Sequence, residues 1–167
     1  MPELRKMNER DAKAQWRYVA AQPADENGVT NPYCGVGWTD YRERVLPELM
    51  MHEHPIGMPD WFVPESYYYL WDGGVLVGEV RIRHHLTEAL RRGAGHIGYS
   101  IAQPFRGRGY GTRALGLALE VARGIVPETE IYLRVRKGNT PSIRAMRRNG
   151  AYPAGEDAEH LFFRVKK

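Results

Sequence analysis

The sequence is poor in cysteine and in long apolar runs. Its single cysteine, Cys34, has no partner for an internal disulfide or a Cys-x-x-Cys motif, so we expect a small buried or half-buried residue. Every apolar run is interrupted within a few residues, and the N-terminus MPELRKMNERD is charged where a signal peptide would be apolar. These absences predict a soluble, cytoplasmic protein without a membrane partner.

The sequence also lacks repeats and low-complexity tracts. Its 167 residues suit one core better than two, which predicts a single domain over residues 1–167. The segment His52-Glu53-His54 has no third ligand at metal-site spacing and lacks the H-E-x-x-H pattern, so we predict a polar helix end and no metal site.

The net charge of +4 is modest, but arginines gather in the central third of the chain. Such a cluster suits an anionic ligand or a nucleic acid. No recognition helix or aromatic RNA-binding motif accompanies it, so we expect no nucleic-acid partner and keep a nucleic-acid-binding domain as the weakest alternative. The arginines concerned are Arg81, Arg83, Arg91, Arg92, Arg106, Arg108 and Arg113.

Residue patterns in the first half predict two helices and a hairpin. We expect a helix over 9–21, and another from about Thr39 that Pro47 kinks or ends. Two strand-like runs then flank the turn 72–74, with Leu76, Val80 and Ile82 on one face of the second strand. Val77, Glu79 and Arg81 should occupy the opposite face.

The second half has a more regular pattern. A loop over 86–95 should lead to the strand HIGYSI, a glycine-rich loop and a helix that Gly124 closes. Clean alternation predicts a strand over 130–136, followed by a helix over 140–149. The tail should form a hairpin that turns at 155–157. This order predicts an α/β (α+β) fold with a mixed sheet.

The glycine-rich loop QPFRGRGYGTRAL, residues 103–115, sits between a strand and a helix. It lacks the Gly-Lys-Ser/Thr of a Walker loop and the G-x-G-x-x-G of a dinucleotide-binding loop. It keeps what phosphate binding requires, namely glycines that let backbone N–H groups turn inward, a helix N-terminus and arginines. The loop therefore predicts a pyrophosphate site.

The form Arg-x-x-Gly-x-Gly over 106–111 resembles the acyl-CoA pyrophosphate loop of the GNAT superfamily of N-acetyltransferases. Downstream, RKGNTPSIRAMRRNGAY resembles the second motif of that superfamily, with Asn139, Ser142, Gly150 and Tyr152 at or within one place of its positions. The resemblance covers residues 66–165, and residues 1–64 form a variable N-terminal part.

The resemblance implies a mostly antiparallel central sheet flanked by helices, with a strand-loop-helix pyrophosphate site and acetyl-CoA as cofactor. The strand at 99–102 should splay from the strand at 131–136 and pair with the pantetheine arm. Asn139 would contact the pantetheine or a proton-carrying water. The cofactor-binding residues it implies are Ile101, Ala102, Arg106, Gly107, Arg108, Gly109, Tyr110, Gly111, Thr112, Asn139 and Ser142.

The implied activity is acetyl transfer to a primary amine of a small molecule or peptide, by direct attack in a ternary complex. Many members of this superfamily have a proton-donating tyrosine where this chain has Met146. Tyr99 or Tyr152 can replace it, or the thiolate, with a thiol pKa of about 8.5, can leave unaided. The departure also leaves open a non-catalytic acyl-CoA-binding or sensing domain.

For the general base the sequence offers His96 first, at the start of a strand, where imidazole titrates in the useful range. Glu79 and the pair His84-His85 are the other candidates. Glu79 lies on a strand predicted to be partly buried, where it can instead pair with an arginine such as Arg81 or Arg134.

Two further features concern partners. An aromatic cluster either lines the acceptor pocket or packs in a core. The acceptor should be chosen by the N-terminal third and by residues 84–95. In the last hairpin, Phe162 should lie on the face opposite Leu161 and Phe163, which makes a homodimer a candidate assembly. The aromatic residues are Trp61, Tyr67, Tyr68, Tyr69 and Trp71.

Overall fold

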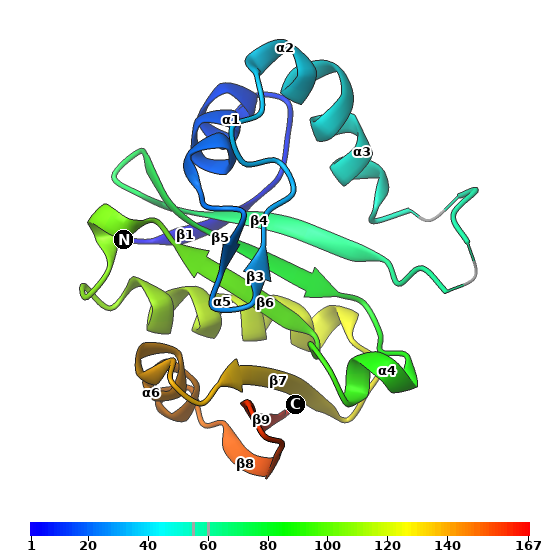
Figure 1. Ribbon diagram of the computed structural model, residues 1–167, viewed down its shortest axis with the longest axis vertical. Coiled ribbons are helices and arrows are strands. Elements are labelled where there is room, and N and C mark those ends of the chain that lie inside the picture. Colours follow the sequence, from blue (N-terminus) through cyan, green and yellow to red (C-terminus); the bar gives the residue numbers. More distant parts are fainter. Residues whose placement is uncertain (55, 60) are drawn as a thin grey trace.

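Two antiparallel sheets form the centre of the molecule in the computed structural model, which describes residues 1–54, 56–59 and 61–167 (Figure 1). The four-stranded sheet has the order β1-β4-β5-β6, and the three-stranded sheet has the order β7-β9-β8. The predicted mixed, mostly antiparallel α/β fold is confirmed. The strands are β1 (Glu3–Lys6), β4 (Glu65–Asp72), β5 (Val75–Arg83), β6 (Ile97–Ile101), β7 (Glu130–Arg136), β8 (Tyr152–Glu156) and β9 (His160–Lys166).

Helices cover these sheets, and a small hairpin stands beside β6 (Figure 1). The hairpin consists of β2 (Asp25–Glu26) and β3 (Val29–Thr30). No helix in the described residues is long and apolar enough to span a membrane. The helices are α1 (Ala12–Ala21), α2 (Trp38–Asp40), a π-helical turn (Tyr41–Val45), α3 (Leu46–Met51), α4 (Glu88–Arg91), a 3₁₀ turn (Gln103–Phe105), α5 (Tyr110–Ile125) and α6 (Thr140–Arg148).

The first of two hydrophobic cores lies between α5 and one face of both sheets. Val80 and Ile82 of β5 and Leu133 of β7 pack there against Leu115 and Leu119 of α5, and all five are at most 2% exposed. The three strand residues alternate with more polar neighbours, so burial of this face fixes the strand register. Transfer of these side chains from water stabilises the fold by about 1.5–3 kcal/mol each.

The second core lies on the other face of the four-stranded sheet, beneath α1 and the helical segment 38–51. Tyr67, Tyr69 and Trp71 of β4 are buried there, whereas Tyr68 packs on the first core. The alternative that these aromatic side chains pack in a core is therefore confirmed for four of the five residues in the predicted cluster. Trp61 is 75% exposed and belongs to neither core.

The predicted hairpin of β4 and β5 is confirmed, but its faces are not. Leu70 pairs with Gly78 while Trp71 pairs with Leu76, so Val77 is an extra residue on β5. This β-bulge reverses the alternation: Val77 joins the first core and Leu76 packs on the second. The prediction that Leu76 shares a face with Val80 and Ile82 was wrong.

Other differences concern segment ends and exposure. The segment over 86–95, expected as a loop, contains α4, whose first turn is capped by the hydroxyl of Thr87. Helix α5 continues past Gly124 to Ile125, and the last turn lies after Glu156 instead of at 155–157. Cys34 is exposed, not buried.

The two sheets meet only briefly in the described residues. A single bridge joins Gly95 to Leu133, and beyond it β6 and β7 have separate partners. The expected splay between these strands is confirmed. It leaves one edge of β6 free at the point where the glycine-rich loop begins.

Candidate active site

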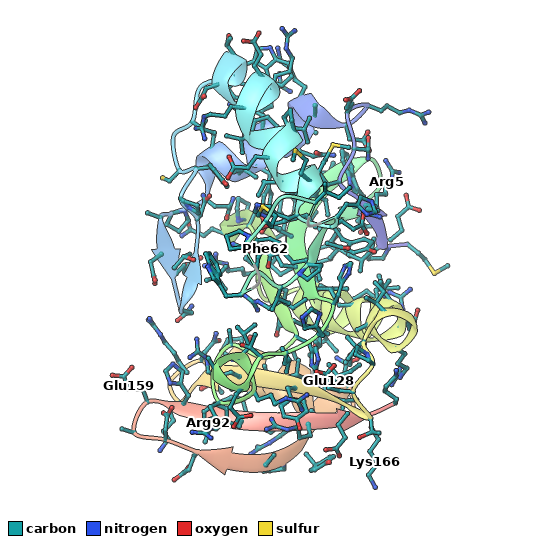
Figure 2. The ribbon with its side chains drawn as sticks, turned by 90° about the vertical axis from the view of Figure 1, so that its right-hand side faces the viewer. Arg5, Phe62, Arg92, Glu128, Glu159 and Lys166 are labelled. Atoms are coloured by element: carbon teal, nitrogen blue, oxygen red, sulfur yellow. The ribbon has the colours of Figure 1, made fainter. Side chains whose placement is uncertain are left out.

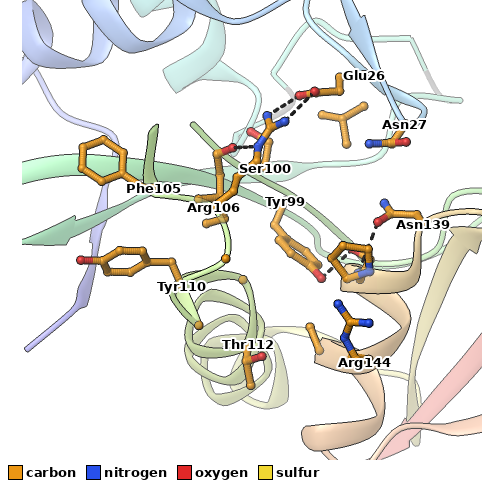
Figure 3. A pocket seen from close by; sticks show the side chains of 18 of the residues that line it. Glu26, Asn27, Tyr99, Ser100, Phe105, Arg106, Tyr110, Thr112, Asn139 and Arg144 are labelled. Carbon is orange, nitrogen blue, oxygen red and sulfur yellow. Dashed lines mark hydrogen bonds and ion pairs between the residues drawn. The ribbon is translucent and has the colours of Figure 1, made fainter. Parts of the chain in front are cut away.

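A groove of about 370 Å³ opens where β6 ends, between the start of α5 and the start of α6 (Figure 3). The β2–β3 hairpin borders it on the other side. Its lining residues are Glu26, Asn27, Val29, Tyr99, Ser100, Ile101, Phe105, Arg106, Gly107, Gly109, Tyr110, Gly111, Thr112, Asn139, Pro141, Ser142, Arg144, Ala145 and Arg148.

The glycine-rich loop presents a row of free backbone donors at this groove. Among the described residues, no acceptor lies within hydrogen-bond reach of the N–H groups of residues 107–112. The φ angles of Gly107 and Gly109, 75° and 84°, lie in the left-handed region that other residues adopt at a cost. With the N-terminus of α5, this loop has the donors and the positive field that bind a phosphate or pyrophosphate.

The side chain of Arg106 is turned toward the β2–β3 hairpin. Its Nε donates to the carbonyl oxygen of Ile101 at 2.8 Å, and its two terminal nitrogens donate to the Glu26 carboxylate. This pairing with Arg106 lowers the pKa of Glu26. Arg106 is thus already paired with an anion of the chain.

Two other residues expected at the cofactor do not line the groove. Arg108 is exposed and its guanidinium lies over the ring of Phe105, 6.0 Å from the ring centroid. Ala102 is 9% exposed and packs in the second core. The sequence placed Arg108 in the glycine-rich loop and Ala102 on the strand before it, but had no information on which way each side chain points.

The far wall of the groove is the first turn of α6. Asn139 caps this helix, because its side-chain oxygen accepts a hydrogen bond from the backbone N–H of Ser142. The hydroxyl of Ser142 lies 2.8 Å from the hydroxyl of Tyr99 on β6, so the two walls are joined at the floor of the groove (Figure 3). Burial raises the pKa of Tyr99 and keeps its phenol protonated.

The structure places His96 where it cannot act as a base. The residue is fully buried, its Nδ1 accepts from the backbone N–H of Tyr132, and its Nε2 lies 3.2 Å from the Glu128 carboxylate. The Nδ1 contact fixes the proton on Nε2, so neither nitrogen is free. Burial lowers the pKa of His96. The expectation of a catalytic His96 is corrected to a structural role.

Glu79 lies next to the groove instead. It sits opposite Ser100 in the β5–β6 ladder, and both border a small recess of about 20 Å³ beneath the β2–β3 hairpin. Ser100 also lines the main groove, so the recess and the groove adjoin. The Nε of Arg81 donates to Glu79 at 2.9 Å, which is the pairing that the sequence offered as the alternative.

Tyrosines surround Glu79 on its buried side. Burial first, and then the negative charge of Glu79, raise the pKa values of Tyr18 and Tyr69. The hydroxyl of Tyr18 lies 2.9 Å from that of Ser100, whereas the hydroxyl of Tyr69 has no partner among the described residues. Glu79 is therefore a carboxylate in a polar, largely water-excluded setting that opens toward the groove.

With the groove described, comparison with known proteins identifies the family. A family model described as "Acetyltransferase (GNAT) domain" matches residues 3–152. The chain belongs to the GNAT acetyltransferase family. The expected family and its acyltransferase activity are thereby confirmed.

Solved structures of other GNAT acetyltransferases share the fold over the whole chain. RimL, a ribosomal L7/L12 α-N-protein acetyltransferase in complex with coenzyme A, is 18% identical with a TM-score of 0.70, covering 99% of this chain and 93% of that one. Mycobacterium smegmatis RimJ in complex with CoA-disulfide is 24% identical with a TM-score of 0.68, covering 99% and 81%. The aminoglycoside acetyltransferase AAC(6')-Ib is 18% identical with a TM-score of 0.65, covering 100% and 95%.

Met146 stands where the resemblance led us to expect a proton-donating tyrosine, and its side chain does not reach the groove. Met146 is 2% exposed and packs in the first core. Tyr152, one of the two expected substitutes, hydrogen-bonds Glu130 and does not line the groove. Tyr99, the other expected substitute, does line the groove.

The remaining candidate bases, His84 and His85, also lie away from the groove. The Nε2 of His84 contacts the Ser66 hydroxyl at 2.8 Å, and that hydroxyl donates to Glu53. His85 is exposed. Among the described residues, no three His, Cys, Asp or Glu side chains gather as metal ligands would.

Arg144 and Arg148 line the groove, and the sequence analysis did not select them. They lie four residues apart on α6, so they share one face of this helix. That spacing, following the Asn139 cap, was the signal available in the sequence. It places two guanidinium groups across the groove from the free N–H groups of the glycine-rich loop.

Proposed function

We propose that this protein transfers an acetyl group from acetyl-CoA to a primary amine of a small molecule or peptide, by direct attack in a ternary complex. The observation that carries the proposal is the row of free N–H groups at residues 107–112, which faces a groove in a GNAT fold. Acetyl-CoA supplies the thioester carbonyl that the amine attacks. Every other task falls to the chain.

The first task is to hold the pyrophosphate. The N–H groups of the glycine-rich loop, the positive end of α5 and the guanidinium groups of Arg144 and Arg148 all border the groove. Charge-assisted hydrogen bonds of this kind contribute about 1.5–3 kcal/mol each. Because Arg106 is already neutralised by Glu26, we assign it to the wall of the groove rather than to the pyrophosphate.

The second task is to place the reactive end of the cofactor. Beyond the bridge at Gly95, β5 is the only described strand that pairs with β6, and the other edge of β6 has no strand partner among the described residues. The amide-rich pantetheine arm can add to this edge as a further strand would. That alignment directs the thioester toward Ser100, a strand residue that borders both the groove and the recess at Glu79.

The third task is removal of the amine proton, which we assign to Glu79. The recess beside Glu79 has room for one water molecule. A base can act through one water, so the Glu79 carboxylate accepts the proton that the amine gives to that water. The hydrogen bond from Arg81 orients this carboxylate.

The fourth task is protonation of the leaving thiolate, which we assign to Tyr99. Its hydroxyl lies at the floor of the groove against the hydroxyl of Ser142, and burial keeps it protonated. Met146 lies in the core, and Tyr110, the other tyrosine among the described lining residues, donates its hydroxyl to Asp72, so the role falls to Tyr99.

Thermal shift followed by thiol release tests the proposal. Acetyl-CoA should raise the melting temperature, whereas NADH, ATP and a short DNA duplex should not, because only a ligand of the folded state stabilises it. Release of free thiol with a panel of primary amines should follow. Binding without thiol release across the panel would favour the alternative of a non-catalytic acyl-CoA sensor. A shift with DNA alone would overturn the proposal.

A further inference from the structure

The faces of β5, β6 and β7 that point away from α5 carry a concentration of guanidinium groups at the point where the sheets split. On each strand the residues that alternate with the first core form this surface. We call it the acceptor face, because it borders the recess at Glu79. Its members are Glu79, Arg81 and Arg83 on β5, Gly98 and Ser100 on β6, and Tyr132, Arg134 and Arg136 on β7.

The middle of the acceptor face is open. Arg81 lies opposite Gly98 in the β5–β6 ladder, and a side chain built at Gly98 would meet nothing within 4 Å. The Nη1 of Arg83 donates to the carbonyl oxygen of Gly95 at 3.1 Å. Gly95 in turn bridges to Leu133, the neighbour of Arg134. Arg83 and Arg134 therefore approach the split from its two sides.

Positive charge exceeds negative charge on this face. Arg81 pairs with Glu79 at 2.9 Å, and Arg83 has only a long contact of 3.8 Å to Glu65. Among the described residues, Arg134 has no ion pair or side-chain hydrogen bond, although it is partly buried. Burial lowers the pKa of Arg83, and the like charges of Arg81 and Arg134 act in the same direction, against the opposing charge of Glu65.

Two polypeptide segments border the acceptor face, and each has contacts of its own. The carbonyl oxygen of Thr30 in the β2–β3 hairpin accepts from Arg81 at 2.6 Å. On the other side, Phe62 lies in front of the middle of the molecule, between α3 above and α4 below (Figure 2), and its ring packs against His52. Among the described residues, Arg134 forms no ion pair with either segment, whereas Asp25 of the hairpin lies 3.9 Å from Arg136.

We propose that Arg83 and Arg134 bind an anionic group of the acceptor, so that the preferred acceptors are amines that carry a carboxylate nearby. The inference rests on the proposed function and names its substrate class. The amine is directed to the recess at Glu79, and the carboxylate to the guanidinium groups across Gly98. Partly buried like charges repel, and a bound carboxylate offsets that repulsion with charge-assisted hydrogen bonds.

The same charges disfavour polycations. Two proteins with the same fold are named for spermidine and for aminoglycosides, which carry several amino groups. They are a chimera of the spermidine N-acetyltransferase SpeG from Vibrio cholerae with hSSAT, and the aminoglycoside acetyltransferase AAC(6')-Ib. An acceptor of that class would bring positive charge against Arg83 and Arg134, at a cost in binding. We therefore expect this chain to discriminate against such acceptors.

The test measures thiol release with three peptides that share a free N-terminal alanine and differ only in the next two residues, which are Asp-Asp, Asn-Asn or Lys-Lys. Free aspartate is a fourth acceptor, which separates a small amino acid from a peptide. We expect kcat/KM to be about tenfold higher for Asp-Asp than for Asn-Asn, and lowest for Lys-Lys. High salt should reduce the difference.

Two substitutions of Arg134 test whether the preference depends on the acceptor face. Arg134→Gln should remove most of the preference for Asp-Asp over Asn-Asn, and Arg134→Glu should shift the preference toward Lys-Lys. Arg123→Glu is the matched control, since it makes the same change in net charge on an exposed turn of α5. It should behave as the unmodified protein does.

The outcomes separate the two proposals. Equal rates with all three peptides, or a preference that Arg134→Glu and Arg123→Glu alter alike, would overturn the anionic-acceptor inference and leave acetyl transfer standing. Thiol release from no amine at all, despite acetyl-CoA binding, would overturn the proposed function first.

Discussion

The guanidinium of Arg106 holds the carboxylate of Glu26 through hydrogen bonds of 2.8 and 2.5 Å. This pair joins the glycine-rich loop to the β2–β3 hairpin, two segments that are 80 residues apart in the sequence. It borders the groove, and under the proposed function the free N–H groups of the loop, rather than the first arginine of the motif, bind the pyrophosphate.

This assignment predicts different roles for two arginines. Arg106→Met should change the Kd for acetyl-CoA by less than about threefold, because Glu26 already neutralises that side chain. Arg148→Met should weaken binding about tenfold, because its guanidinium lines the groove opposite the loop. Calorimetric titration measures both. A larger loss in Arg106→Met than in Arg148→Met would return Arg106 to the pyrophosphate.

Glu79→Gln should lower kcat by about 100-fold, because the variant loses the proposed base. Its Kd for acetyl-CoA should stay close to that of the unmodified protein, since Glu79 lies in the recess and does not line the groove. Glu53→Gln is the matched control, because Glu53 is also a partly buried carboxylate, paired with Lys6. An unchanged kcat at saturating amine would remove Glu79 from the mechanism.

Tyr99→Phe should lower kcat while the fold is kept, because the ring still packs on the first core and only the hydroxyl is lost. Loss of a proton donor lowers kcat by about 100-fold or more, and by less where the thiolate leaves readily. The alkaline limb of the pH–rate profile should change with it. Tyr152→Phe is the control, since its hydroxyl contacts Glu130 outside the groove. Equal effects of the two substitutions would contradict the assignment.

His96→Asn should reduce stability rather than chemistry. The imidazole is fully buried and hydrogen-bonded at both nitrogens, so its loss should lower the free energy of unfolding by about 2–4 kcal/mol. It should also leave Glu128 without one of its partners. Assayed well below the melting temperature, kcat should change by less than about threefold, whereas loss of a general base costs about 100-fold or more. A fall of that size in kcat would restore His96 as the base.

The pH dependence of stability has a defined sign. Burial lowers the pKa of folded His96 below the unfolded value of about 6.5, so the unfolded chain binds the proton more tightly. The associated stability is present above that pH and is lost as the pH falls through the folded pKa. The urea midpoint should therefore drop more between pH 7 and pH 5 in the unmodified protein than in His96→Asn. His84, whose pKa is also lowered, titrates in both.

The parts of the fold that the sequence predicted depend on local patterns. Alternation over 130–136 and the Asn139 cap are visible within a few residues, and both elements form as expected. The glycine-rich loop was predictable for the same reason, since positive φ angles at Gly107 and Gly109 require glycine wherever the loop lies.

The failures depend on partners that are distant in sequence. A position at the start of a strand says nothing of Glu128 and the N–H of Tyr132, which occupy both nitrogens of His96. The bulge at Val77 depends on the pairing with β4, and the side chain of Arg106 depends on a hairpin 80 residues away. Met146 was recognised as a departure, but its burial in the core required the packed structure.

The central claim is that the N–H groups of the glycine-rich loop bind the pyrophosphate of acetyl-CoA. Calorimetric titration of acetyl-CoA into Gly109→Asp tests it most directly, because that change brings a negative charge to the row of donors. Gly74→Asp is the control: its φ of 80° is close to the 84° of Gly109, and it lies in the β4–β5 turn, where a side chain also meets open space. We predict that Gly109→Asp loses measurable binding while Gly74→Asp keeps it, and unchanged affinity in Gly109→Asp would contradict the claim.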